Sequence, residues 1–161
     1  MANELTLRGV SAQLSSVNCR KENHGDDKVP AVDLKLEMEL DADQVAQLWG
    51  GLPLQLWHEN NERTPLLPPG NEIALGETVF EEHRVEIGNE GVDDDWVLLG
   101  SAKISKARIV IVGGGMAKVT LRVQSDVGGD QTSELHERLG EWLAFTCHPR
   151  QQDMVGKAAA A

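Results

Sequence analysis

The amino-acid sequence predicts a mostly β protein of the α+β class: a single antiparallel, strongly curved sheet or barrel with two short helices. In residues 32–41 an apolar residue at every even position alternates with a charged residue at every odd position. A period of two places all the apolar side chains on one face of a strand. Residues 117–124 repeat this alternation, and the three glycines at 113–115 supply a hairpin turn before them.

Length and composition predict one folded domain. The chain has 161 residues, of which 40% are hydrophobic and 25% are charged, a composition that excludes wholesale disorder. We expect a single β-rich domain over residues 1–148 and a flexible tail over residues 149–161, which carry no pattern.

We expect a cytoplasmic protein. No apolar run approaches the ~18 residues that span a bilayer, and the first residues lack the basic and apolar regions of a signal peptide. Cys19 and Cys147 show no CxxC spacing, so we predict that both are free thiols.

The first elements predicted are a long hairpin. Residues 5–22 form its first strand, in which the apolar parity switches at Gly9 and indicates a bulge or bend. Residues 23–28 supply the turn, and residues 29–40 return as the second strand. Pro30 near the start of that strand implies an edge position or a local break in pairing.

A short helix is predicted next, over residues 41–49. Asp41 and Gln44 stand three residues apart as in a capping box, and two glycines follow the helix as a stop signal. Residues 52–58 are expected to form a strand and residues 59–76 a long, proline-rich loop.

Two strands, over residues 78–87 and 96–103, are predicted on either side of an acidic turn at 89–95. A second hairpin follows over residues 105–125. The apolar spacing then predicts a helix over residues 131–143 and a last short strand over residues 143–147.

The segment at residues 109–117, IVIVGGGMA, has two interpretations. It resembles the strand and glycine loop of a dinucleotide site, but that site needs a third small residue followed by a helix. Lys118 stands at the third position and strand alternation continues, which favours a hairpin turn. No GK[ST] follows, so a P-loop is excluded. We predict no cofactor.

No metal or catalytic motif is present. The five histidines are scattered without ligand spacing, and we interpret them as surface residues. The acidic pairs and runs lack the EF-hand pattern and are typical of solvated turns. The chain has neither GxSxG nor a cysteine with an evident nearby base. We therefore predict no metal site and no catalytic residues, and an enzyme ranks third among the functional hypotheses.

A charge asymmetry supplies the candidate binding site. The formal net charge is −11, yet residues 97–125 contain no acidic residue. Five basic residues fall inside this segment: Lys103, Lys106, Arg108, Lys118 and Arg122. Such a patch either tracks the phosphates of a nucleic acid or pairs with acidic side chains on neighbouring strands. The aromatic residues of a base-stacking platform are missing from this face.

The first forty residues, with a hairpin turn containing HG, an AVDLKLE strand and then a short helix, resemble a family of small proteins encoded by tailed bacteriophages and prophages. The resemblance covers about a quarter of the chain and implies a phage accessory protein in a bacterial cytoplasm, among the early genes of DNA metabolism. It transfers no site residue.

The same segment is similar to the first hairpin of an OB-fold. OB-type single-strand binders expose a basic and aromatic face, whereas the charged face of residues 33–41 is mostly acidic.

Two functional hypotheses remain from different classes. The first is a non-catalytic, phage-encoded accessory module that binds nucleic acid through the basic hairpin. The alternative is a module that binds a phage or host protein, as a virion or assembly component or as an inhibitor, with sheet edges also able to join copies of the chain. Neither involves a membrane.

Overall fold

The computed structural model describes residues 4–48, 71–75, 78–89, 96–112 and 115–150. In chain order the elements are β1 (Leu7–His24), β2 (Asp27–Asp41), α1 (Ala42–Gln47), β3 (Glu72–Leu75), β4 (Phe80–Gly88), β5 (Val97–Ile111), β6 (Met116–Asp126), α2 (Gly129–Glu137) and β7 (Trp142–Pro149).

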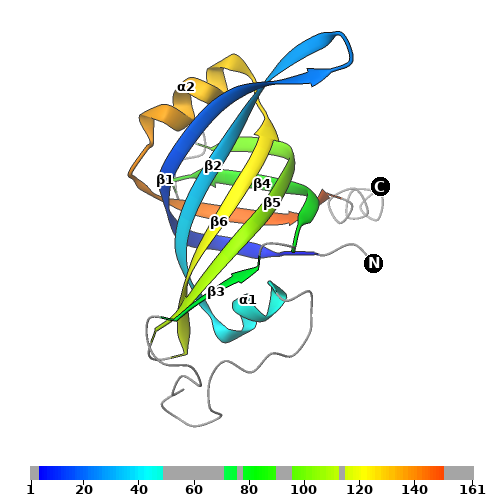
Figure 1. Cartoon of the computed structure of the whole chain (residues 1–161). Helices are drawn as coiled ribbons and strands as arrows, with labels where there is room; N and C mark the ends of the chain where they lie inside the picture. Colours follow the sequence, from blue (N-terminus) through cyan, green and yellow to red (C-terminus); the bar gives the residue numbers. More distant parts are fainter. Residues whose placement is uncertain (1–3, 49–70, 76–77, 90–95, 113–114, 151–161) are drawn as a thin grey trace, which may run out of the picture.

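Six of the strands close into an antiparallel barrel (Figure 1). They follow the order β5-β4-β7-β1-β2-β6, and pairing between β5 and β6 joins the two ends of the sheet. The short β3 pairs with the last part of β5, beyond the residues that pair with β4. The predicted fold class is therefore confirmed.

The barrel interior is filled by the apolar residues of the two alternating hairpins. In β2 every even position from Val32 to Leu40 is buried, and in β6 every odd position from Ala117 to Val123 is buried. Phe80 and Phe145 are the largest side chains in this core. The charged side chains of the same strands face outward, as their period of two requires.

Bulges bend β1. Leu7 pairs with Cys147 and Val10 with Phe145, so β1 carries one extra residue here. Gly9, at φ +59°, occupies this bulge, and its N–H donates to Thr146 Oγ1 at 2.9 Å. The bend predicted at Gly9 is confirmed, because a left-handed backbone is readily adopted by glycine.

β5 is one continuous strand, and the predicted division into residues 96–103 and a new strand from residue 105 is wrong. Its apolar parity shifts at two bulges, one at Gly100 and one at Lys106. Each extra residue flips the side chains that follow, so the alternation breaks although the strand continues.

α1 closes one end of the barrel and ties down the start of the chain. The predicted capping box is present, with Asp41 Oδ1 accepting from Gln44 N and Gln44 Oε1 accepting from Asp41 N. The Gln47 amide accepts from Thr6 N at 2.8 Å and donates to Thr6 O at 3.0 Å, holding the residue just before β1.

α2 lies at the opposite end (Figure 1) and is shorter than predicted. The predicted helix ran to Leu143, but that residue belongs to β7 and its side chain is buried in the barrel. Leu139 and Trp142, which were assigned to the apolar helix face, are exposed. Gly140, at φ +86°, turns the chain between the two elements, and an apolar spacing cannot reveal this reversal.

β3 lies within residues 59–76, which were predicted to be a loop, so that prediction was wrong for these four residues. Several predicted segments lie outside the described residues: the strand over 52–58, the rest of that loop up to residue 70, most of the turn at 89–95, and residues 151–161 of the tail. No helix in the described ranges has the length and apolar character needed to cross a membrane.

His83 is buried inside the barrel, which corrects its interpretation as a surface residue. Its Nε2 accepts a hydrogen bond from Leu5 N at 3.0 Å, so its Nδ1 carries the proton and donates to Glu81 O at 2.9 Å. Burial lowers the pKa of His83, and the Glu81 carbonyl opposes this only in part. The imidazole therefore holds the start of the chain only in its neutral form.

This geometry predicts acid sensitivity. The pKa of His83 is lower in the folded chain than the ~6.5 of an unfolded one, so the unfolded state binds the proton first. The free energy of unfolding should be unaffected by His83 above about pH 6.5 and should fall as the pH drops below it. Urea unfolding from pH 7.5 to 5 should show this loss in the wild type and a flatter profile in His83→Gln. Parallel profiles would contradict it.

Candidate anion-binding groove

A groove of about 450 Å³ runs over the outer face of the barrel, across β1, β2, β6, β5 and β3. Leu34, Val110 and Leu121 also belong to its lining. Its charged lining consists of Lys35, Lys106, Arg108, Lys118 and Arg122, with Asp33 and Glu72 as the carboxylates. Among the described lining residues, five cations against two anions make this groove basic on a chain whose net charge is −11.

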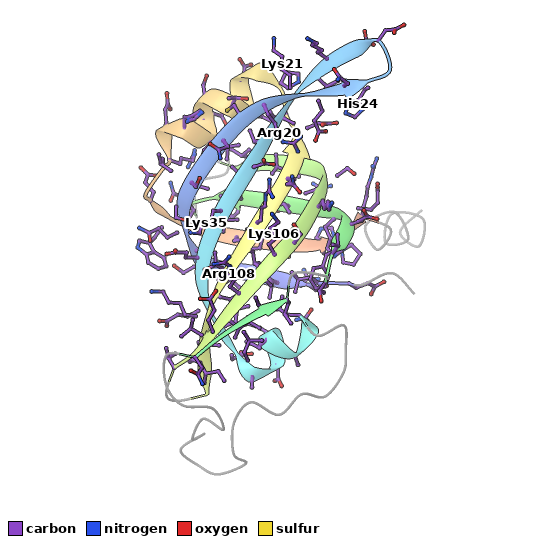
Figure 2. The ribbon with its side chains drawn as sticks, in the orientation of Figure 1. Arg20, Lys21, His24, Lys35, Lys106 and Arg108 are labelled. Carbon is purple, nitrogen blue, oxygen red and sulfur yellow. The ribbon has the colours of Figure 1, made fainter. Side chains whose placement is uncertain are left out.

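Strand register brings these cations together. Lys35 on β2 lies directly opposite Arg122 on β6. Arg108 on β5 lies opposite Thr120, the residue of β6 between Lys118 and Arg122. Figure 2 shows Lys35 and Arg108 with Lys106 over the middle of this face. Like charges directly opposite each other repel, and a bound anion would relieve that repulsion.

Asp33 is a carboxylate of the groove lining that accepts three side-chain hydrogen bonds. It accepts from Arg122 Nη2 at 2.8 Å, from Gln124 Nε2 at 3.0 Å and from Arg20 Nε at 3.1 Å. Burial by itself would raise the pKa of Asp33, but these hydrogen bonds outweigh it and hold that pKa below its ordinary value. Asp33 is therefore ionised at neutral pH and neutralises part of the positive charge.

The three lysines are not neutralised in this way. Among the described residues, no carboxylate lies within 4.0 Å of Lys35, Lys106 or Lys118, whereas Arg108 pairs with Glu72 at 3.4 Å. Glu39 lies opposite Lys118 in the β2–β6 register without forming such a pair. The expectation that the basic residues pair with acidic neighbours thus holds for the two arginines and not for the lysines.

Lys106 is held in a strained backbone. It occupies the bulge between Ser105 and Arg108 with φ +53°, a left-handed conformation that costs a residue with a side chain about 1 kcal/mol or more. The bulge adds one residue to β5, so that both Lys106 and Arg108 are exposed on the groove side.

Four of the five residues predicted from the sequence line this groove, and the fifth does not. Lys103 lies in a neighbouring groove of about 340 Å³, which it shares with Glu22, Glu81, Glu82 and Asp126. Lys35 was not predicted to belong to the site, because it stands in a strand whose other outward charges are acidic. Its register opposite Arg122 is the signal that reveals it.

Two further clusters were missed because they join distant residues. Cys19 Sγ lies 3.1 Å from His136 Nε2, so the statement that no cysteine has a nearby base was wrong. The second cluster lies at the start of the β1–β2 turn and consists of Glu22, His24 and Asp126. Each of these side chains offers one potential metal-ligand atom, and the three atoms lie within 4.8 Å of one another. Glu22 also pairs with Arg20.

Both cysteines are free thiols, as predicted.

No protein-family model, no curated protein and no solved structure matches this chain. The resemblances to phage proteins and to the OB-fold therefore stay predictions.

The Asp33 network predicts a loss of stability in Asp33→Asn. The change removes the negative charge that Arg20 and Arg122 share, and we expect it to lower the free energy of unfolding by about 1–2 kcal/mol, since the guanidinium groups keep partial contact with water. Urea unfolding at pH 7 measures this loss. Asp43→Asn, on the exposed surface of α1, is the matched control and should change little.

The strain at Lys106 predicts the opposite result for Lys106→Gly. Glycine adopts φ +53° without steric cost, so the free energy of unfolding should rise by about 1 kcal/mol. Lys103→Gly, in the same strand but without a positive φ, should lower it. A decrease in both variants would show that the bulge is not strained.

Proposed function

We propose that this chain is a non-catalytic accessory module that binds the phosphate backbone of a nucleic acid in the basic groove. The observation that carries the proposal is a set of three lysines around one groove of an acidic protein, none of which has a carboxylate partner among the described residues. A local positive potential of this kind attracts phosphates, while the negative remainder disfavours indiscriminate binding.

The arrangement of the cations supports an extended ligand over a single ion. Lys118 and Arg122 are four residues apart on one face of β6, and neighbouring outward positions on a strand are separated by about 6.7 Å. Lys35 and Arg108 widen this row on either side. A row of cations along a strand can contact successive phosphates.

The residues that line the groove also indicate that it does not recognise bases. No aromatic residue belongs to the described lining of the groove, so bases have no stacking platform there. Contacts with phosphates position a nucleic acid without reading its sequence. Binding should therefore be independent of sequence, weak at physiological salt, with Kd of about 10⁻⁴–10⁻⁶ M, and stronger at low salt. A role among the early genes of a phage is part of this proposal and rests on the N-terminal resemblance.

The alternative, a protein-binding module that acts through sheet edges, has less support. The six barrel strands pair in a closed ring, which leaves few edges for augmentation in the described part of the chain. Salt separates the two hypotheses, because an apolar protein interface changes little as the salt concentration rises.

The test removes the unpartnered charges. Replacing Lys35, Lys106 and Lys118 together by Gln should abolish binding of a single-stranded oligonucleotide at physiological salt. At low salt, the slope of log K against log salt should flatten by roughly 2, at about 0.7 per lost contact. Fluorescence anisotropy measures both effects. Arg122 is a poorer target than the lysines, because its loss would also break the Asp33 network.

A matched control replaces Lys21, Lys28 and Lys103 by Gln, three exposed lysines that do not line the groove. It changes the net charge equally and should leave most of the affinity intact. Asp33→Asn should bind more tightly than the wild type in spite of its lower stability, because it frees Arg122. Equal losses in the two lysine triples would refute the groove as the site.

A further inference from the structure

A second reactive feature of the surface is the contact between Cys19 and His136. Cys19 lies on β1 and His136 in the last turn of α2, at a sequence separation of 117 residues. The 3.1 Å distance joins Sγ to Nε2, and both residues are exposed to solvent. A thiol and an imidazole in this arrangement form the nucleophile and base of a reactive cysteine.

Chemically, the thiolate and not the thiol attacks an electrophile. The imidazole of His136 is within reach to accept the proton from Cys19 Sγ and to stabilise the resulting anion. Cys147 is the internal contrast. It is fully buried, its Sγ faces the Leu5 carbonyl at 3.7 Å, and burial raises the pKa of its thiol to about 12.

The position of Cys19 ties its chemistry to α2. Cys19 pairs with Val32, whose side chain belongs to the barrel interior, so both face the inner side of the sheet. β7 pairs with β1 only as far as Gln13, and beyond that point α2 lies against β1 and β5 (Figure 1). The groove lies on the other side, where the preceding residue, Asn18, contributes to its lining.

Few contacts of the described residues hold α2 in place. Leu135 is its buried apolar side chain. Just beyond the helix, Gly140 N donates to Leu14 O of β1 at 2.7 Å. Gln131 Nε2 donates to Leu98 O at 2.7 Å, and the contact between His136 and Cys19 links the helix itself to β1. A group attached to Cys19 Sγ would occupy the space where His136 lies and would break that link.

We propose that Cys19 is a modification site that forms a mixed disulfide with a low-molecular-weight disulfide of the glutathione type, with His136 as its base, and that the adduct loosens α2. His136 accepts the thiol proton, and the Cys19 thiolate attacks one sulfur of the disulfide. The S–S bond of the reagent breaks as the new S–S bond forms. The other half leaves as a thiolate and takes up the proton. Cys19 is oxidised and the leaving half is reduced, so the disulfide is the only co-reactant.

The test follows adduct formation at each cysteine by peptide mass spectrometry, with glutathione disulfide at pH 7.5 as the probe. Cys19 of the folded wild type should react at least about tenfold faster than the same cysteine in the urea-unfolded chain, and Cys147 should stay unmodified while the chain is folded. His136→Gln should slow the reaction of Cys19 by about tenfold. His24→Gln, which changes another exposed histidine, is the matched control and should react like the wild type.

Equal rates for Cys19 in the wild type and in His136→Gln would overturn the dyad, and so would equal rates in the folded and unfolded wild type. The latter comparison needs no variant and holds even if His136→Gln folds poorly.

Amide exchange of α2 should rise in the adduct while that of β2 and β6 stays unchanged, and unchanged exchange in α2 would overturn its coupling to Cys19. Oligonucleotide affinity should be unaltered by the adduct, since the groove lies on the opposite face of β1.

Discussion

The pairing of β5 with β6 is the constraint on which the rest of the structure depends. It joins the two ends of a six-stranded sheet, so the buried apolar side chains of the described strands pack into one core. A sheet closes in this way only if its strands are strongly bent, and here bulges in β1, β4 and β5 produce the bending. β5 carries two of them and can therefore pair with β4, β3 and β6 along its length.

The same bulges shape the surface that we propose as functional. The bulge in β5 that aids closure also holds Lys106 in a left-handed conformation within the groove. Glu82, in the bulge of β4, has φ +57° and lies in the neighbouring acidic groove. Strained residues with long charged side chains therefore stand in both grooves, one of each sign. Such strain persists only where the surrounding ladders define the backbone on both sides.

Electrostatics divides the outer face into regions of opposite sign. Asp33 ties the partly exposed side chains of Arg20 and Arg122 into a network that fixes Arg122 in the lining of the groove. The lysines beyond it remain solvated and lack carboxylate partners among the described residues, so their charge is available to a ligand. Arg20 also lines the neighbouring groove, where Lys103 lies among the acidic residues Glu22, Glu81, Glu82 and Asp126. Cys19 lies on the inner side of β1 and belongs to neither of the two grooves.

Much of the fold could be predicted because the strand residues obey a local rule. The alternation in residues 32–41 and 117–124 determined which side chains enter the core, Gly9 marked a bend, and Asp41 with Gln44 marked a helix start. Each of these signals acts between neighbours in the chain. The basic segment likewise identified four of the groove cations before any fold was known.

Only the tertiary structure decided the remainder, because it depends on pairing between distant strands. Register placed Lys35 opposite Arg122, and Asp33 within reach of both arginines, which no spacing along the chain could show. Burial of His83 and the approach of His136 to Cys19 likewise depend on barrel closure and on the packing of α2. By itself the sequence determined which residues face inward and which carry charge; the closed sheet decided which of them meet, since strands far apart in the chain become neighbours only when the barrel forms.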